Sequence, residues 1–317
     1  MVRHVVRHDP GVLTAPSRLV SNLYVYKQSV RVGEALFLAS YFRPTDLDQA
    51  LTLLADGHRV IVAGGTDYYP SRVGRPLDDD VLDVTALEAL RAIEVAGDHF
   101  RIGALATWTD VVEADLPACF DGLKRAARAV GGAQIQNAAT VVGNVCNASP
   151  AADGTPCLLT LDAAVELASV DGKRAMPLAE FVIGNRRTTR HQNELVTAIR
   201  IPRPRDGARS TFLKLGARRY LVISIVSVAA VIEPAQDGTI ARARIAVGAC
   251  SEAPRRLDAL EAALAGRALS RDIGDVVTAS HLGELSPIDD IRGSMEYRND
   301  AAVTLVRRAL TELAEAQ

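Results

Sequence analysis

A short apolar stretch of the sequence runs into two adjacent glycines and a polar pair. Residues 61–70 read IVAGGTDYYP, in which Gly64 and Gly65 are followed by Thr66 and Asp67. Glycine lets the backbone approach a ligand closely, and main-chain N–H groups in such a turn can hold an anion. A tight turn without a ligand is the simpler interpretation, and this motif alone does not distinguish it from an anion-binding loop.

A second segment carries polar groups among small residues. Residues 131–153 read GGAQIQNAATVVGNVCNASPAAD and have no charge before Asp153. The segment supplies hydroxyl, amide and carboxylate groups from Thr140, Asn144, Ser149 and Asp153. Long exposed loops normally carry charge, so we expect a loop whose backbone packs closely, against a ligand or against the rest of the chain.

Other nucleotide-binding motifs do not occur in the sequence. We find neither the GxGxxG of a dinucleotide-binding βαβ unit nor the GxxxxGK[ST] of a P-loop. Nicotinamide binding to a Rossmann domain is therefore not expected. The formal net charge of -2 and the pI near 6.3 give no basic footprint for nucleic acid or an anionic membrane.

The composition indicates a globular chain that we expect in the cytoplasm. No apolar run is long enough to span a membrane, and charged residues such as Arg3 and Arg7 interrupt the start of the sequence. The four cysteines show no CxxC pair and no metal-ligand spacing, so we expect buried thiols and no metal site. Cys146 and Cys157 are interpreted as small apolar fillers.

The glycine turn must be positioned by a helix and a strand. Thr45 is the predicted N-cap of a helix, with Asp48 three positions on, and apolar residues recur over 47–54 before Gly57. The stretch RVIVAGGTD then changes to strand periodicity. Further strands are predicted at 81–84, 92–95, 100–104, 164–169 and 195–201. One helix is predicted to begin after Thr107, and another to cover residues 123–130.

The pattern changes after residues 202–208, whose sequence PRPRDGA is typical of a linker. Three antiparallel strands are predicted at 211–215, 223–232 and 240–247, with helices at 254–265 and 300–316. A smaller α+β domain therefore follows the linker.

Five motifs in order carry a resemblance to a known family: AGGTD, TVVGNVCNASPAAD, ELVTAIRIP, FLKLGARRY and DDIRGSMEYRND. Together they resemble the FAD-binding medium subunit of the molybdenum hydroxylases, the xanthine dehydrogenase and carbon monoxide dehydrogenase family, over residues 40–315. The resemblance implies an α+β fold with a two-lobed PCMH-type FAD-binding domain at 40–205, its lobes at about 40–95 and 96–205. The smaller α+β domain, with its three-stranded antiparallel sheet, would be 206–317, and 1–39 an amino-terminal arm.

The resemblance also implies which residues bind FAD. The first loop, around the pyrophosphate, comprises Ile61, Val62, Ala63, Gly64, Gly65, Thr66, Asp67 and Tyr68. The second comprises Thr140, Val141, Val142, Gly143 and Asn144, followed by Ser149. Val142 replaces a family glycine, and we expect it in a β-like conformation because positive φ would cost it about 1–2 kcal/mol.

Further contacts follow from the same resemblance. Asp153 matches an acid near the ribityl chain and ring, Leu195 and Val196 match an apolar pair at the isoalloxazine, and Lys214 matches a basic residue near the cofactor. Val130 and Thr107 are matched more loosely, and Tyr220 could lie near the flavin edge. Without the resemblance, Leu195 and Val196 would be ordinary core residues and Asp153 a helix cap or Asx turn. Lys214 would point to solvent, and Tyr220 would be a tyrosine at the end of a sheet.

The implied function is electron transfer within a complex. In this family a large subunit with a molybdenum cofactor hydroxylates the substrate, a small subunit carries two [2Fe–2S] clusters, and the FAD of the medium subunit receives the electrons. The acceptor would be NAD⁺ or another oxidant, and the assembly a dimer of heterotrimers. We therefore expect no catalytic acid, base or nucleophile in this chain. A stand-alone FAD-dependent oxidoreductase and a flavin-free structural subunit remain the alternatives.

Overall fold

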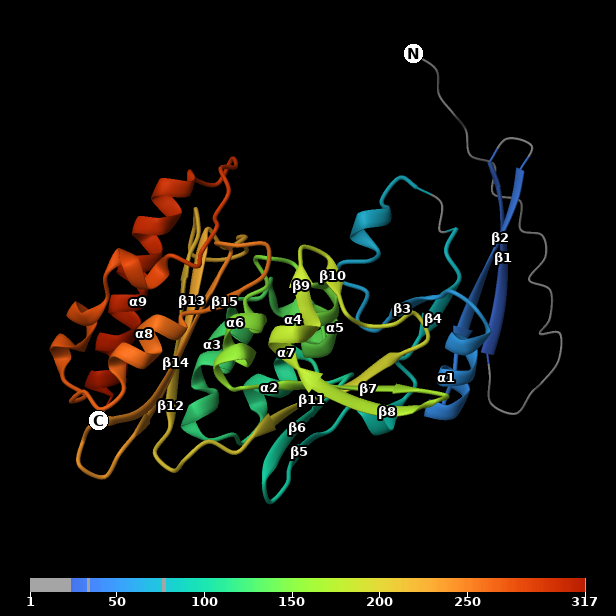
Figure 1. Ribbon diagram of the computed structural model, residues 1–317. Helices are drawn as coiled ribbons and strands as arrows, with labels where there is room; N and C mark the ends of the chain where they lie inside the picture. The colour runs from blue at the N-terminus through green and yellow to red at the C-terminus, as the bar shows by residue number, and fades with distance from the viewer. Residues whose placement is uncertain (1–23, 33–34, 76–77, 317) are drawn as a thin grey trace, which may run out of the picture.

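The protein is described by a computed structural model that covers residues 24–32, 35–75 and 78–316, with side chains from residue 39 (Figure 1). Residues 1–23 of the expected arm lie outside this part. No helix in the described ranges is long and apolar enough to cross a membrane.

The first lobe is built on a four-stranded sheet in the order β1-β2-β4-β3. Its strands are β1 (Tyr24–Val32), β2 (Ala35–Arg43), β3 (Val60–Val62) and β4 (Val81–Asp83). β1 and β2 are antiparallel, whereas β4 pairs in parallel with both β2 and β3. The expected boundary at residue 39 falls inside β2, so residues 35–39 continue directly into the sheet of this lobe.

Helix α1 (Leu47–Asp56) begins one residue later than the sequence predicts. The N-cap is Asp46, not Thr45, because the carboxylate of Asp46 accepts the main-chain N–H of Gln49 at 2.9 Å. The helix buries one apolar face and ends at Gly57, as expected. It leads the chain into β3 and so into the glycine turn.

The second lobe contains a five-stranded antiparallel sheet in the order β5-β6-β11-β7-β8. The strands are β5 (Ile93–Val95), β6 (His99–Gly103), β7 (Ala164–Ser169), β8 (Gly172–Pro177) and β11 (Leu195–Pro202). Its helices are α2 (Trp108–Glu113), α3 (Asp121–Ala129), α4 (Ala133–Ala138), α5 (Val141–Asn147), α6 (Gly154–Thr160) and α7 (Leu178–Phe181). A two-stranded ribbon pairs β9 (Val182–Gly184) with β10 (Arg187–Thr188).

The long loop predicted at 131–153 is wrong, because the segment forms α4 and α5. The hydroxyl of Thr140 caps α5 by accepting the N–H of Gly143 at 2.9 Å. Val142 is accordingly helical, and the β-like conformation expected for it is wrong. It is not among the positive-φ residues of the described chain, so the valine carries no left-handed strain.

The third unit has the predicted three strands and a short fourth. Its sheet consists of β12 (Arg209–Leu215), β13 (Val226–Pro234), β14 (Ile240–Gly248) and β15 (Arg255–Arg256). The helices are α8 (Asp258–Leu264) and α9 (Met295–Glu315). α9 begins before the predicted residue 300 because the hydroxyl of Ser294 caps it, accepting the N–H of Tyr297 at 3.1 Å.

This sheet is buried on both faces, as Figure 1 shows from α8 and α9 on one side and α3 and α6 on the other. Alternate residues of β13 divide between two cores. Val226, Val228, Ala230 and Ile232 pack in the cluster with α8 and α9, whereas Ala229 and Val231 join the cluster of the second lobe. The uninterrupted apolar run of β13 therefore reflects two buried faces.

A buried ion pair also joins the two units. Lys214 on β12 lies with its Nζ 2.6 Å from Oδ2 of Asp153, which directly precedes α6, and Ser224 donates its hydroxyl to Oδ1 at 2.6 Å. Burial raises the pKa of Asp153, while the ammonium of Lys214 opposes that shift. The carboxylate is 5% exposed, so its charge depends on this pairing.

Replacing Lys214 with Met should destabilise the fold strongly, because it leaves the Asp153 carboxylate buried and unpaired. We expect a loss of about 3–5 kcal/mol in the free energy of unfolding, measured by denaturant titration. The double variant K214M/D153L, which removes both charges, should recover part of that loss. Lys173→Met, at an exposed lysine on β8, is the control, and equal effects of K214M and K173M would contradict a stabilising role for the pair.

Candidate functional site

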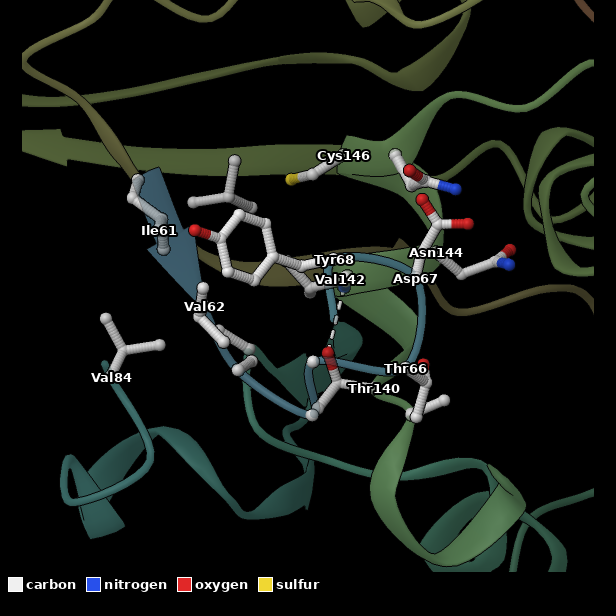
Figure 2. A pocket seen from close by; sticks show the side chains of 18 of the residues that line it. Ile61, Val62, Thr66, Asp67, Tyr68, Val84, Thr140, Val142, Asn144 and Cys146 are labelled. Carbon is white, nitrogen blue, oxygen red and sulfur yellow. Dashed lines mark hydrogen bonds between the residues drawn. The ribbon is translucent and has the colours of Figure 1, made fainter. Parts of the chain in front are cut away.

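A cavity of about 530 Å³ lies where the turn after β3 meets α5 and the start of β11 (Figure 2). Its volume falls within the range of small-molecule and cofactor sites. The walls come from both lobes, since β3 belongs to the first and β11 to the second. An extended ligand could therefore contact both lobes at once.

The two glycines after β3 are required by the geometry of the chain. A Cβ on Gly64 would overlap the carbonyl oxygen of Ala138, and Gly65 has a φ of +66° with the ring of Tyr69 2.5 Å from where its Cβ would lie. Any larger residue at position 64 would separate the turn from the segment that leads into α5. The two glycines thus allow the two candidate binding segments to lie in contact.

Unpaired backbone donors line the same cavity. The main-chain N–H groups of Gly64, Gly65 and Thr66, and that of Val142 in the first turn of α5, donate to no acceptor within the part of the chain that the structure describes. N–H groups left free in this way are suited to bind an anionic ligand. The cavity therefore offers donors from two separate segments.

An unpaired acceptor lies nearby. Oδ1 of Asn144 is buried without a hydrogen-bond partner among the described residues, and Asn144 lines the cavity. Trp108 also lines the cavity, and its Nε1–H is a buried donor that likewise has no acceptor among the described residues. Buried polar atoms are rarely left unpaired, so these two indicate a ligand with polar groups of its own.

Apolar side chains form the rest of the lining. Val130, Leu195 and Val196 contribute from the second lobe, and Ile61 and Val84, which are labelled in Figure 2, contribute from the first. Such a surface suits a flat, largely apolar ring. Burial raises the pKa of the Cys146 thiol to about 11, so this sulfur is neutral and adds no charge.

Arg186 ties two of the site segments together. Its Nη1 donates to Oδ2 of Asp67 at 2.5 Å and also to the side-chain oxygen of Asn147, and its main-chain N–H donates to the carbonyl of Ala148 at 2.9 Å. Asp67 and Arg186 are 119 positions apart in sequence. The arginine thus connects the glycine turn to the carboxyl end of α5.

A second arginine pair fixes the segment before β11. Arg174 on β8 makes two hydrogen bonds to Glu194, Nε to Oε1 at 2.5 Å and Nη2 to Oε2 at 2.9 Å. The hydrogen bond from Arg174 holds the pKa of Glu194 below its ordinary value. Arg190, which lines the cavity, donates to the carbonyl of Glu194 at 2.7 Å, so this pair positions the wall just ahead of Leu195.

Most residues expected at the site line the cavity. They are Ile61, Val62, Ala63, Gly64, Gly65, Thr66, Asp67, Tyr68, Val130, Thr140, Val142, Gly143, Asn144, Leu195 and Val196. The glycine turn and the segment 140–144, which are far apart in the sequence, therefore lie together at one cavity.

Six expected residues do not line it. Thr107 is the N-cap of α2 and shares a capping box with Asp110, while the side chain of Val141 points into the core. Asp153 and Lys214 are paired with each other between the two units. Ser149 lies in the turn after α5 with its hydroxyl accepting the N–H of Ala151, and Tyr220 is 65% exposed.

The structure adds lining residues that sequence reasoning missed: His58, Arg59, Val60, Ser71, Val84, Ala104, Trp108, Ile135, Ala139, Cys146, Asn147 and Arg190. His58 and Arg59 directly precede β3, so continuing the first motif backwards would have found them. Trp108 and Ile135 reach the cavity only through the packing of α2 and α4, and no local pattern marks them. In the described residues, no group of three or more His, Cys, Asp or Glu side chains is placed to hold a metal ion.

Two family descriptions match the chain. Residues 34–204 match the FAD binding domain in molybdopterin dehydrogenase, and residues 211–313 match the CO dehydrogenase flavoprotein C-terminal domain. The two matches adjoin at the segment that joins the second lobe to the four-stranded unit.

Similar proteins cover nearly the same span. The chain is 30% identical over 288 residues to a putative xanthine dehydrogenase FAD-binding subunit of Escherichia coli, covering 86% of this chain and 95% of that one. It is 31% identical over 278 residues to the nicotine 6-hydroxylase medium subunit of Paenarthrobacter nicotinovorans, covering 86% and 96%. A chain of the reconstituted CO dehydrogenase from Oligotropha carboxidovorans superposes with a TM-score of 0.79 at 27% identity, covering 87% and 97%.

Replacing Glu194 with Gln should lower the melting temperature at neutral pH. It should also make the melting temperature less dependent on pH in the acid range. A carboxyl group whose pKa is lowered by folding stabilises the folded state at pH values above its ordinary pKa. This contribution is lost as the pH falls through the lowered pKa. Melting temperatures measured from pH 7 to about pH 3 should therefore fall less steeply for E194Q than for the unmodified protein. Glu113→Gln, at an exposed position on α2, should leave the curve unchanged, and an unchanged curve for E194Q would contradict the role assigned to the pair.

Proposed function

Since this chain belongs to the FAD-binding medium-subunit family of the molybdenum hydroxylases, we propose that it is the electron-transfer subunit of a heteromeric complex. It takes electrons from the [2Fe–2S] clusters of a partner subunit and passes them to NAD⁺ or another acceptor. The observation that carries the proposal is the contact of the glycine turn with Ala138 at the end of α4, which places unpaired N–H groups of the turn and of α5 along one cavity.

The lining suits FAD in its chemistry. The N–H groups of Gly64, Gly65, Thr66 and Val142 are donors for the two negative charges of the pyrophosphate. We assign the isoalloxazine to the apolar wall that includes Leu195. When bound, FAD supplies the redox chemistry, because it can exchange electrons singly or in pairs.

The chain's own contribution is to bind and orient the cofactor. Asn144 offers an unpaired acceptor to a polar group of the ligand, and the Arg186 and Glu194 pairs hold the surrounding segments in place. The neutral Cys146 thiol adds neither a nucleophile nor a charge at the cavity. We therefore assign no general acid, base or nucleophile to this chain, and the hydroxylation site to another subunit.

The proposed partners follow from the family. They are a large subunit with the molybdenum cofactor and a small subunit with [2Fe–2S] clusters, assembled as a dimer of heterotrimers, and the relative from Paenarthrobacter nicotinovorans is itself named a medium subunit. The four cysteines, all free in the structure, support a reducing compartment and hence the cytoplasm. We place the boundary between the FAD-binding domain and the carboxy-terminal domain near residue 205, so that the latter comprises residues 206–317.

The proposal predicts that the chain purifies from its native source with bound flavin and with subunits that contain molybdenum and iron. Visible absorption reports the flavin, elemental analysis the metals, and mass spectrometry the partners. Substrate should bleach the flavin absorption only when the partners are present. Flavin reduction by the isolated chain would favour the stand-alone oxidoreductase, and a folded chain without flavin would favour the structural subunit.

Gly64→Ala should lower FAD affinity by forcing the glycine turn away from Ala138. Loss of two or three backbone hydrogen bonds to a charged group, at about 1.5–3 kcal/mol each, weakens binding by more than 100-fold. Flavin fluorescence titration of the apoprotein measures the effect. The matched control is Gly97→Ala, where a Cβ meets nothing within 4 Å. Unchanged affinity in a folded G64A variant would refute the assignment of the turn.

A further inference from the structure

A second cavity, of about 340 Å³, lies between the FAD-binding domain and the four-stranded unit. Its walls come from α6, α7 and the start of β9 on one side and from β14, β15 and the start of α8 on the other. The cavity shares no lining residue with the FAD cavity. It is therefore a separate site.

A buried hydroxyl in this cavity has no partner. Thr155 on α6 is 1% exposed and lines the cavity, and its Oγ1 makes no hydrogen bond to any residue that the structure describes. Leaving such a group unpaired costs free energy, whereas a ligand with an acceptor atom would satisfy it. The hydroxyl thus indicates that a polar group belongs here.

The charged lining favours an anion. Arg242, Arg255 and Arg256 line the cavity together with the acids Asp162 and Asp258, and Glu261 already binds Arg256 with both of its carboxylate oxygens. Asp162 is already engaged by Arg256 at 2.9 Å and by Arg242 at 3.0 Å.

Arg255 has no ion-pair or hydrogen-bond partner within the described chain, and its side chain is exposed. Of the three arginines it is the one whose donors are fully available. A single negative charge on a ligand could pair with the guanidinium of Arg255.

The remaining walls are apolar. Leu159, Leu178, Ala179, Val182 and Pro254 line the cavity beside the charged groups. A ligand with a hydrocarbon body could bury it against these side chains, at about 25 cal/mol per Å² of apolar surface. Charge and lining together therefore describe a molecule with one anionic group and an apolar part.

We propose that this cavity binds a small organic monocarboxylate between the two domains. Its anionic group is balanced by Arg255, the hydroxyl of Thr155 donates to an acceptor on it, and its hydrocarbon part packs against Leu159 and Val182. A ligand held in this position contacts residues of both domains and stabilises their packing by mass action.

Hexanoate is the probe, and the purified complex with all of its subunits is the sample for calorimetric titration. Hexanoate should bind saturably, while uncharged hexanamide and inorganic phosphate should bind at least tenfold more weakly. Arg255→Gln should abolish the preference for the charged probe. Arg91→Gln, at an exposed arginine in the other lobe, is the matched control and should bind as the unmodified complex does.

Thr155→Val separates a ligand role from a structural one, because valine keeps the shape and removes only the hydroxyl. We expect hexanoate affinity to fall about 3–10-fold, the value of one hydrogen bond, while the melting temperature without ligand does not fall. The proposal is overturned if the complex shows no saturable binding, if T155V or R255Q binds like the unmodified complex, or if phosphate binds as well as hexanoate. The readout is binding without turnover, so its failure leaves the electron-transfer role intact.

Discussion

The close fit between the glycine turn and the carboxyl end of α4 is the constraint on which the site depends. At Gly64 the main chain lies against the carbonyl of Ala138 so closely that no Cβ fits between them. This contact joins the sheet of the first lobe to the helices of the second, and it brings N–H groups of Thr66 and Val142 to one cavity. Main-chain N–H groups on two sides of the cavity can then bind a ligand with adjacent negative charges, and no charged side chain is needed for this.

The remaining structure keeps those two segments in register. Arg186 joins Asp67 to Asn147 and so resists sliding of the turn along α5. Behind α5, α6 packs on β13 and β14, and the Asp153–Lys214 pair fixes the start of α6 against β12. Because β13 divides its side chains between two cores, the carboxy-terminal unit cannot shift without opening both. The binding surface is therefore supported by burial well beyond its own lining.

The sequence predicted the parts of this arrangement whose cause is local. Strand 164–169, the helix ending at Gly57 and the glycine turn follow from periodicity and turn chemistry. The segment 131–153 is predicted as a loop because glycine, alanine and asparagine are typical of loops, and α4 and α5, with six and seven residues, are too short to show a helical period. Asp153 and Lys214 each matched a ligand contact, but no local pattern shows that a carboxylate and an ammonium 61 positions apart pair with each other. Such long-range pairings are decided by tertiary packing.

Val142 shows why a motif should be read through its backbone. A valine in place of a family glycine indicates strain only if that position needs positive φ, and in α5 it does not. The function of the position is carried by its main-chain N–H, which every residue except proline supplies. The valine side chain meanwhile packs into the wall of the cavity, 5% exposed, and adds apolar contact there. Gly64 differs because the carbonyl of Ala138 leaves no space for a Cβ, so position 142 tolerates a side chain whereas position 64 does not.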